Sequence, residues 1–318
     1  MPLRPRAGAG TRYNPPPMHF GDRLSAAVQA TGSPALVGLD PFLDRIPAEF
    51  AAASAPGATR AERAQAVGDF LCAVIEVVAG NAPAVKPQSA FFEALGADGV
   101  VQWERVVAAA KDAGLLVIGD VKRGDIGTTA TAYAQAFLSG VAGTDPRTLC
   151  DAVTVNPYLG SDSIQPFLEC SEDTGIYVLV RTSNPSGAEF QGLGEPNLAE
   201  RVADAVHSWG ADLCGSSGLS RVGAVVGATH PGELGALRER MPNAPLLLPG
   251  YGAQGAGAAD VVAAFTPQSG GMASALVNSS RGILYAYQKQ AGTPWRDATR
   301  SALEEMTYAL KGAVEPVL

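Results

Sequence analysis

The stretch Leu115–Ala130, LLVIGDVKRGDIGTTA, contains one complete passage from a strand through a charged loop to a helix. It begins with a run of apolar and small residues, which is typical of a strand covered on both faces. The run ends at Asp120, Lys122 lies two residues further on, and a helical pattern begins near Thr128. Repetition of such strand–loop–helix units is typical of a parallel α/β fold.

The same unit recurs along the whole chain. Nearly continuous apolar runs predict eight strands, at Ala35–Asp40, Ala84–Lys86, Leu115–Asp120, Ala152–Asn156, Gly175–Arg181, Val222–Gly227, Pro245–Gly250 and Ser274–Asn278. Helical patterns alternate with them, at Ala61–Ala79, Val101–Ala113, Thr128–Leu138, Leu198–Trp209, Pro231–Arg240, Ala256–Phe265 and Arg296–Leu310. Eight such units favour an α/β fold of the (β/α)8 TIM-barrel type, and an open doubly wound sheet is the alternative.

The chain shows no change of composition and no long linker that would divide it. We therefore expect a single barrel domain over residues 18–318. Residues 1–17 contain several Arg and Pro residues but no apolar segment, so they do not resemble a signal peptide, and we expect a disordered arm. The sequence leaves open whether Met18 is the true start.

Charge and composition argue against several classes of protein. The 318 residues carry a formal net charge of −8, whereas binding to nucleic acid needs a basic face. No apolar run reaches the roughly 18 residues needed to span a membrane. The four cysteines are widely spaced and the three histidines are not at metal-ligand spacing. We therefore expect no metal site, no disulfide framework and a cytoplasmic location.

Polar residues recur where the predicted strands end. These tips are Asp40, Lys86, Asp120, Asn156 and Arg181. In a parallel barrel the C-terminal ends of the strands meet at one mouth, where active sites are built. A single polar tip carries little information, because strand ends also meet water. Five such tips together predict a functional site at this mouth.

Asp120 and Lys122 form the most informative pair. A spacing of two residues places both side chains on the same side of an extended strand. A surface ion pair beside a helix start would explain them without any chemistry. However, Lys86 brings a second cation to the same mouth, and opposite charges in a partly buried site keep each other ionised. Such an array would hold a lysine protonated as a general acid.

The pattern Asp-x-Lys-x-x-Asp-Ile resembles the orotidine 5′-phosphate decarboxylases. The variant DVKRGDIGTTATAYAQAF is similar to the longer bacterial branch (type 2) of that family. The resemblance extends from about Phe20 to Tyr287 through further motifs in the same order, VGLDP, VKPQSAFFE, VNPYLG, VRTSNPSG, LPGYGAQGA and VNSSRGI. It implies conversion of orotidine 5′-phosphate (OMP) to uridine 5′-phosphate (UMP) and CO2, the last step of de novo pyrimidine nucleotide biosynthesis, with no metal or organic cofactor.

The resemblance also implies a role for each member of the charge network. Lys122 would protonate C6 of the pyrimidine ring, and Asp120 would lie beside the departing carboxylate. Lys86 would contact the ribose hydroxyls as well as Asp120. Asp125 and Ile126 would enter the site of a neighbouring subunit, so the resemblance implies a homodimer.

Three further residues match positions that contact the nucleoside or lie beside the interface pair. Asp40 would accept hydrogen bonds from the ribose, although a turn residue at a strand end is the plainer interpretation. Ser183 would bind the pyrimidine, although it would also suit an ordinary turn. Thr128 would lie beside the interface pair, and a helix N-cap explains its hydroxyl equally well.

The phosphate contacts implied by the resemblance follow the last two strands. They are Gln254, Arg281 and Gly282, in the region where barrels commonly bind phosphate. Neighbouring glycines would let backbone amides approach the phosphate oxygens, although Gly-rich segments are more often plain loops.

Two other functions remain open at this stage. A metal-dependent sugar-phosphate decarboxylase or aldolase of the same barrel superfamily would share the Asp-x-Lys-x-x-Asp pattern. A non-catalytic nucleotide-binding protein would keep only the phosphate site. The ribose-facing Lys86 and the pair Gln254 and Arg281 favour the nucleotide decarboxylase.

Overall fold

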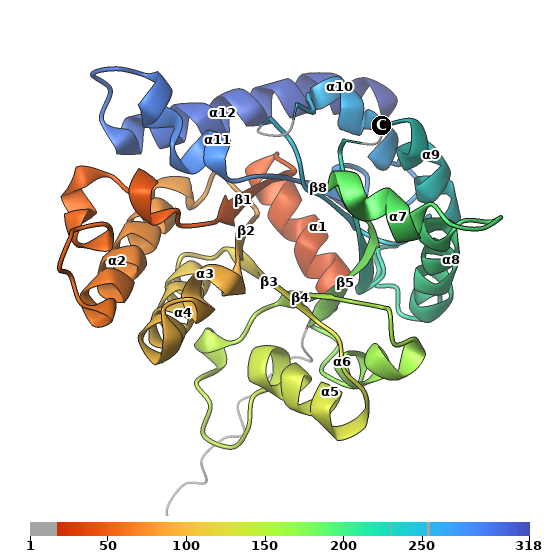
Figure 1. Cartoon of the computed structure of the whole chain (residues 1–318). Helices are drawn as coiled ribbons and strands as arrows, with labels where there is room; N and C mark the ends of the chain where they lie inside the picture. Colours follow the sequence, from red (N-terminus) through yellow and green to blue (C-terminus); the bar gives the residue numbers. More distant parts are fainter. Residues whose placement is uncertain (1–17, 230, 253–254) are drawn as a thin grey trace, which may run out of the picture.

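The computed structural model describes residues 18–229, 231–252 and 255–318. Within these residues eight parallel strands form a closed barrel in chain order, and β8 pairs with β1 (Figure 1). The strands are β1 Ala35–Leu39, β2 Ala84–Pro87, β3 Leu116–Arg123, β4 Ala152–Val155, β5 Gly175–Arg181, β6 Val222–Val226, β7 Leu246–Leu248 and β8 Ala275–Ser279. The predicted (β/α)8 barrel is confirmed, and the open sheet is wrong. The predicted arm, residues 1–17, lies outside the described residues.

Helices surround this barrel and cover the outer face of its strands (Figure 1). They are α1 Phe20–Thr31, α2 Arg60–Val78, α3 Ser89–Glu93, α4 Gly96–Asp112, α5 Gly127–Ala134, α6 Gln165–Leu168, α7 Ala188–Gln191, α8 Leu198–Gly210, α9 Pro231–Arg240, α10 Ala258–Val261, α11 Arg281–Leu284 and α12 Trp295–Val314. The helix predicted at Thr128–Leu138 is divided, because α5 passes into a π-helical turn at Gln135–Ser139.

Capping boxes start two of the long outer helices. In α2 the hydroxyl of Thr59 accepts from the backbone N–H of Glu62, whose carboxylate accepts from the backbone N–H of Thr59. In α8 Asn197 and Glu200 make the same reciprocal pair. Each box satisfies amide groups that have no partner inside the helix, so both starts are set by local sequence.

Helix α1 closes the N-terminal end of the barrel and was not predicted. Its residues Phe20, Leu24 and Val28 are buried against the apolar residues that fill the barrel interior. The ring of Phe20 packs edge-on against Tyr177 at 6.3 Å. Gly175 permits this approach, because a Cβ there would lie 2.4 Å from the Phe20 ring. Since α1 precedes the first strand, it belongs to no strand–helix unit, and the repeating pattern did not reveal it.

The barrel interior changes from apolar to polar along the strands. Near the N-terminal end, inward positions hold Leu36, Ala84, Ile118, Ala152 and Leu276. Because side chains alternate between the two faces of a strand, the inner face continues every second residue toward the other end. The positions that follow on this face are Asp40, Lys86, Asp120, Thr154 and Asn278. A closed apolar base therefore supports a layer of polar side chains at the mouth.

Candidate active site

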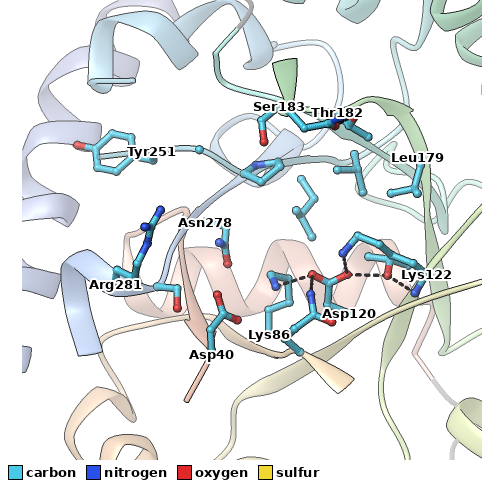
Figure 2. Close-up of a pocket in the computed structure, with 18 residues that line it drawn as sticks. Asp40, Lys86, Asp120, Lys122, Leu179, Thr182, Ser183, Tyr251, Asn278 and Arg281 are labelled. Atoms are coloured by element: carbon cyan, nitrogen blue, oxygen red, sulfur yellow. Dashed lines mark hydrogen bonds and ion pairs between the residues drawn. The ribbon is translucent and has the colours of Figure 1, made fainter. Parts of the chain in front are cut away.

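A cavity of about 420 Å³ opens at the C-terminal mouth of the barrel (Figure 2). Its size suits a small organic ligand. Six of the residues predicted from sequence line it, namely Asp40, Lys86, Asp120, Lys122, Ser183 and Arg281. They come from five different strands or the loops after them, so the closed barrel brings together residues that are far apart in the chain.

The carboxylate of Asp120 is the centre of a hydrogen-bond network at one side of the cavity. Its Oδ2 accepts from the Nζ of Lys86 at 2.8 Å and from the side-chain amide of Gln88 at 2.9 Å. Its Oδ1 accepts from the Nζ of Lys122 at 2.5 Å and from the hydroxyl of Thr154 at 2.9 Å. Both oxygens are therefore engaged, and one negative charge lies between two ammonium groups.

This arrangement keeps Asp120 and Lys86 charged although both are buried. Burial opposes ionisation of Asp120, but the charges of Lys86 and Lys122 outweigh it and hold the pKa of Asp120 well below its usual range. Burial likewise opposes the charge of Lys86, whose side chain is 5% exposed, but Asp120 and Asp40 raise its pKa above the usual value. The side chain of Lys122 is 46% exposed and reaches into the cavity, where a ligand can meet it.

Lys122 reaches Asp120 through a distorted strand, not through regular alternation. The β3–β4 pairing is regular at Gly119–Val153, shifts, and resumes at Arg123–Val155. Within this bulge Lys122 has a φ of +45°, the single positive value among the non-glycine residues that the structure describes. The prediction that Asp120 and Lys122 lie side by side is correct, but the physical reason is a bulge that turns the lysine back toward the carboxylate.

Three polar groups near Lys86 have no partner among the described residues. They are Oδ1 of Asp40, Oδ1 of Asn278 and Oγ of Ser280, all buried and all in residues that line the cavity. Buried polar atoms are rarely left unpaired in proteins. Figure 2 shows Asp40 and Asn278 directed into the space beside Lys86. These atoms could receive hydrogen bonds from the hydroxyls of a bound ligand.

Arg281 lies at the opposite side of the cavity from Lys122, next to Tyr251 (Figure 2). Its guanidinium is exposed and could pair with an anion. The predicted contact Gln254 lies outside the described residues. The amides of Gly252 and Gly255 donate within their own loop, at 2.8 Å to Ala256 and 3.1 Å to Gly252, so those two glycines do not offer amides to a ligand in this conformation.

Ser183 lies in the loop after β5, which is held by side chains. Gln191 accepts from the backbone amide of Thr182 at 3.0 Å and donates to its hydroxyl at 2.8 Å. Arg181 donates to Gln191 and to the carboxylate of Glu233. Gly227 lets this loop pack against the end of β6, since a Cβ there would lie 3.0 Å from Ser183. The loop therefore presents Ser183 to the cavity from a braced position.

Several predicted residues do not line this cavity. Asp125, Ile126 and Thr128 are absent from its lining, and Ile126 is 53% exposed. Helix α5 begins at Gly127 with Ile126 as its N-cap, so the N-cap interpretation of Thr128 is wrong. Gly282 lies in α11, next to Arg281, but is not part of the lining.

Two of the polar strand tips have other surroundings. Asn156 lines a neighbouring groove instead, and its Oδ1 accepts from the amide of Tyr158. Arg181 braces the loop after β5 through Glu233, as described above. Three of the five polar strand tips therefore line the cavity, whereas Asn156 and Arg181 stabilise neighbouring loops.

Three polar residues of the lining were not predicted from the sequence, namely Gln88, Thr154 and Asn278. Each lies on the inner face at a two-residue interval from an inward residue, namely Lys86, Ala152 and Leu276. That periodicity could have found them. They were overlooked because uncharged polar residues in apolar runs resemble ordinary strand residues.

In the part of the chain that the structure describes, no three His, Cys, Asp or Glu side chains are grouped as metal ligands. None of the described helices combines the length and apolar character needed to cross a membrane.

A closed parallel barrel with a charged cavity at the strand ends defines a (β/α)8 enzyme. The model of the orotidine 5′-phosphate decarboxylase / HUMPS family matches residues 39–293. The chain belongs to this family. Its activity is decarboxylation of OMP to UMP in pyrimidine nucleotide biosynthesis, which makes it a carboxy-lyase.

The similarity to individual decarboxylases extends over most of the chain. The orotidine 5′-phosphate decarboxylase of Rhodopirellula baltica is 43% identical over 305 residues, which cover 93% of this chain and 100% of the relative. The enzyme of Deinococcus radiodurans is 47% identical over 241 residues, which cover 74% and 84%. The crystal structure of a putative orotidine 5′-phosphate decarboxylase from Streptomyces avermitilis has a TM-score of 0.75 at 35% identity and covers 95% of this chain and 98% of its own. These near full-length matches agree with the predicted longer branch of the family.

Proposed function

We propose that the chain decarboxylates OMP by electrostatic catalysis without a metal ion, with Lys122 as the proton donor to C6. The observation that carries this proposal is the carboxylate of Asp120 between the ammonium groups of Lys86 and Lys122, at 2.8 and 2.5 Å, in a cavity at the barrel mouth. A charged donor fixed in advance stabilises charge as it develops, with no reorganisation at the moment of reaction.

In the proposed step, the bond between C6 and the carboxylate carbon breaks and its electron pair stays on C6. CO2 leaves, and a proton passes from the ammonium of Lys122 to C6, forming UMP and a neutral amine that takes a proton from water. The ammonium stabilises the carbanion before it donates. Asp120 holds Lys122 in place and lies beside the carboxylate that departs.

The lining of the cavity supports one orientation of the substrate. The phosphate would pair with Arg281, with Gly282 and Gln254 as further predicted contacts at that end. The ribose would lie between Lys86 and Asp40. The buried Oδ1 of Asp40 has no hydrogen-bond donor among the described residues and would accept from a ribose hydroxyl. The pyrimidine would extend toward Lys122, under the loop that carries Ser183.

The charge arrangement disfavours a metal-dependent reaction at Asp120. Both oxygens of its carboxylate already accept hydrogen bonds from an ammonium group. A divalent cation at this carboxylate would lie close to two positive charges, which opposes its binding.

The test is turnover by protein treated with EDTA and then freed of the chelator. Loss of OMP absorbance should proceed at the untreated rate, and added Mg²⁺, Mn²⁺ or Zn²⁺ should not increase it. Loss of turnover after EDTA, restored by one of these ions, would contradict the metal-free mechanism and favour the metal-dependent class.

We further propose that the active form is a homodimer in which Asp125, Ile126 and Thr128 of one chain lie at the site of the other. In support, these residues follow β3 yet do not line the cavity of their own chain. Ile126, in the loop after β3, is exposed, as are Tyr158 and Leu159 in the loop after β4. Exposed apolar side chains in neighbouring loops are typical of an interface.

The chain has four free cysteines and no disulfide between them. A reducing compartment maintains that state. We therefore propose the cytoplasm as the place where the enzyme acts.

A further inference from the structure

We propose that Thr154 is a positioning residue for the proton donor: its hydroxyl holds the bulge in β3 that directs Lys122 toward Asp120. Thr154 lies in β4, lines the floor of the cavity and is 1% exposed. This inference rests on the proposed function of Lys122 and adds the residue that gives the lysine its direction.

The backbone of the bulge departs from the regular pairing of parallel strands. Between the pairs Gly119–Val153 and Arg123–Val155, β3 contains two more residues than β4. A regular parallel strand would direct its amides to carbonyl groups of the neighbouring strand. Here the amides of Val121 and Lys122 both donate to the Oγ1 of Thr154, at 3.0 and 2.9 Å. One side chain therefore replaces the missing backbone acceptors.

Lys122 has an unusual backbone conformation. Its φ of +45° lies in the left-handed region, which is unfavourable for a residue with a Cβ. Such a conformation persists only when its surroundings hold it. The donor of the hydrogen bond to Thr154 is the backbone amide of this strained residue itself. The hydrogen bond therefore restrains the backbone from which the ammonium extends.

Thr154 also contacts the carboxylate of Asp120. The hydroxyl of Thr154 donates its proton to Oδ1 of Asp120 at 2.9 Å, the same oxygen that accepts from the Nζ of Lys122. A hydroxyl has one proton and two lone pairs, and all three are used here. Thr154 therefore fixes both ends of the Asp120–Lys122 pair. A valine has the same shape and can make none of these bonds.

The test compares Thr154→Val with the conservative variant Thr154→Ser. We expect Thr154→Val to lower kcat at saturating OMP on the order of 10²-fold, because a small displacement of a reacting group has an effect of that size. Binding of UMP should change little, since the contacts with ribose and phosphate remain. Thr154→Ser keeps the hydroxyl and should retain most of the turnover.

Thr299→Val is the matched control. Thr299 is fully buried in α12, and its hydroxyl has no partner among the described residues, so this variant removes a buried hydroxyl away from the site. It should keep wild-type kcat. Full turnover by Thr154→Val would overturn the inference. So would a parallel loss of kcat and UMP affinity, because general damage to the cavity would weaken both.

If Thr154→Val does not fold, Thr154→Cys replaces it, because a thiol is a weak donor and a weak acceptor. Low kcat in Thr154→Cys beside an active Thr154→Ser supports the inference, and full turnover in Thr154→Cys overturns it. Lys122→Ala tests the underlying function separately. An inactive Lys122→Ala with a fully active Thr154→Val would refute the role of Thr154 alone.

Discussion

Asp120 shows how a single residue organises this site. Its carboxylate accepts hydrogen bonds from Lys86, Gln88, Lys122 and Thr154, which come from three strands or their ends. Burying an unpaired ammonium or carboxylate would cost much free energy. In this network each buried charge has an oppositely charged partner, which offsets that cost. In the proposed mechanism, the same network holds the ammonium of Lys122 where a carbanion develops.

The shifted pKa values predict how turnover responds to pH. A lowered pKa keeps Asp120 ionised as the pH falls, and a raised pKa keeps Lys86 protonated as the pH rises. Neither group should therefore produce a limb in kcat between about pH 5 and 9, although the ordinary pKa values of Asp and Lys, about 3.9 and 10.4, lie not far outside this range.

The measurement is a pH profile of kcat and kcat/KM for OMP. Because the second pKa of a phosphate monoester is about 6, kcat/KM should fall below pH 6 as Arg281 loses a dianionic partner. By contrast, kcat at saturation should not follow that fall. An acid limb of kcat centred between about pH 5 and 6 would show that the pKa of a carboxylate in the network is raised, and would contradict this prediction.

At the scale of elements, the strands and outer helices follow local sequence closely. Apolar runs predicted all eight strands, and the capping boxes at Thr59 and Asn197 agree with helices expected from periodicity. The bulge in β3 was not predictable, because it depends on Thr154 in another strand. The position of the loop that carries Ser183 was not predictable either, because Arg181, which braces the loop, pairs with Glu233, a residue distant in sequence.

The closing helix α1 gives a prediction about stability. Phe20 is fully buried against the barrel base, so Phe20→Ala should lower the free energy of unfolding by about 3–5 kcal/mol. Urea unfolding measures this change. Phe190→Ala, at a side chain that is 67% exposed, is the control and should change the free energy by less than about 0.5 kcal/mol. An equally small effect at Phe20 would mean that α1 does not seal the barrel.

At the scale of the whole molecule, one chain does not account for every predicted site residue. Six of them line the cavity, whereas Asp125, Ile126 and Thr128 do not. A dimer with twofold symmetry would bring these three residues of each chain to the other chain, because such an interface is made twice by the same residues. The motifs predict both sets of residues, and the resemblance to the family implies that Asp125 and Ile126 serve the site of a neighbouring subunit.

Mixing two inactive variants tests this arrangement. Co-expression of Lys122→Ala with Asp125→Asn should recover about a quarter of wild-type turnover, because half of randomly formed dimers are hybrids with one intact site. Co-expression of Lys122→Ala with Asp120→Asn is the control and should recover none, since each lesion then lies in its own chain's site. Equal turnover from both mixtures would argue against a shared site.

The central claim is that the ammonium of Lys122 supplies the proton that replaces CO2. Turnover of OMP by Lys122→Ala tests it most directly, with UMP binding as the measure of an intact cavity and Lys311→Ala, at an exposed lysine of α12, as the control. We expect kcat to fall about 10⁴-fold or more, because both proton donation and charge stabilisation are removed, while UMP still binds. A Lys122→Ala enzyme that decarboxylates OMP at a rate close to that of Lys311→Ala would contradict the claim.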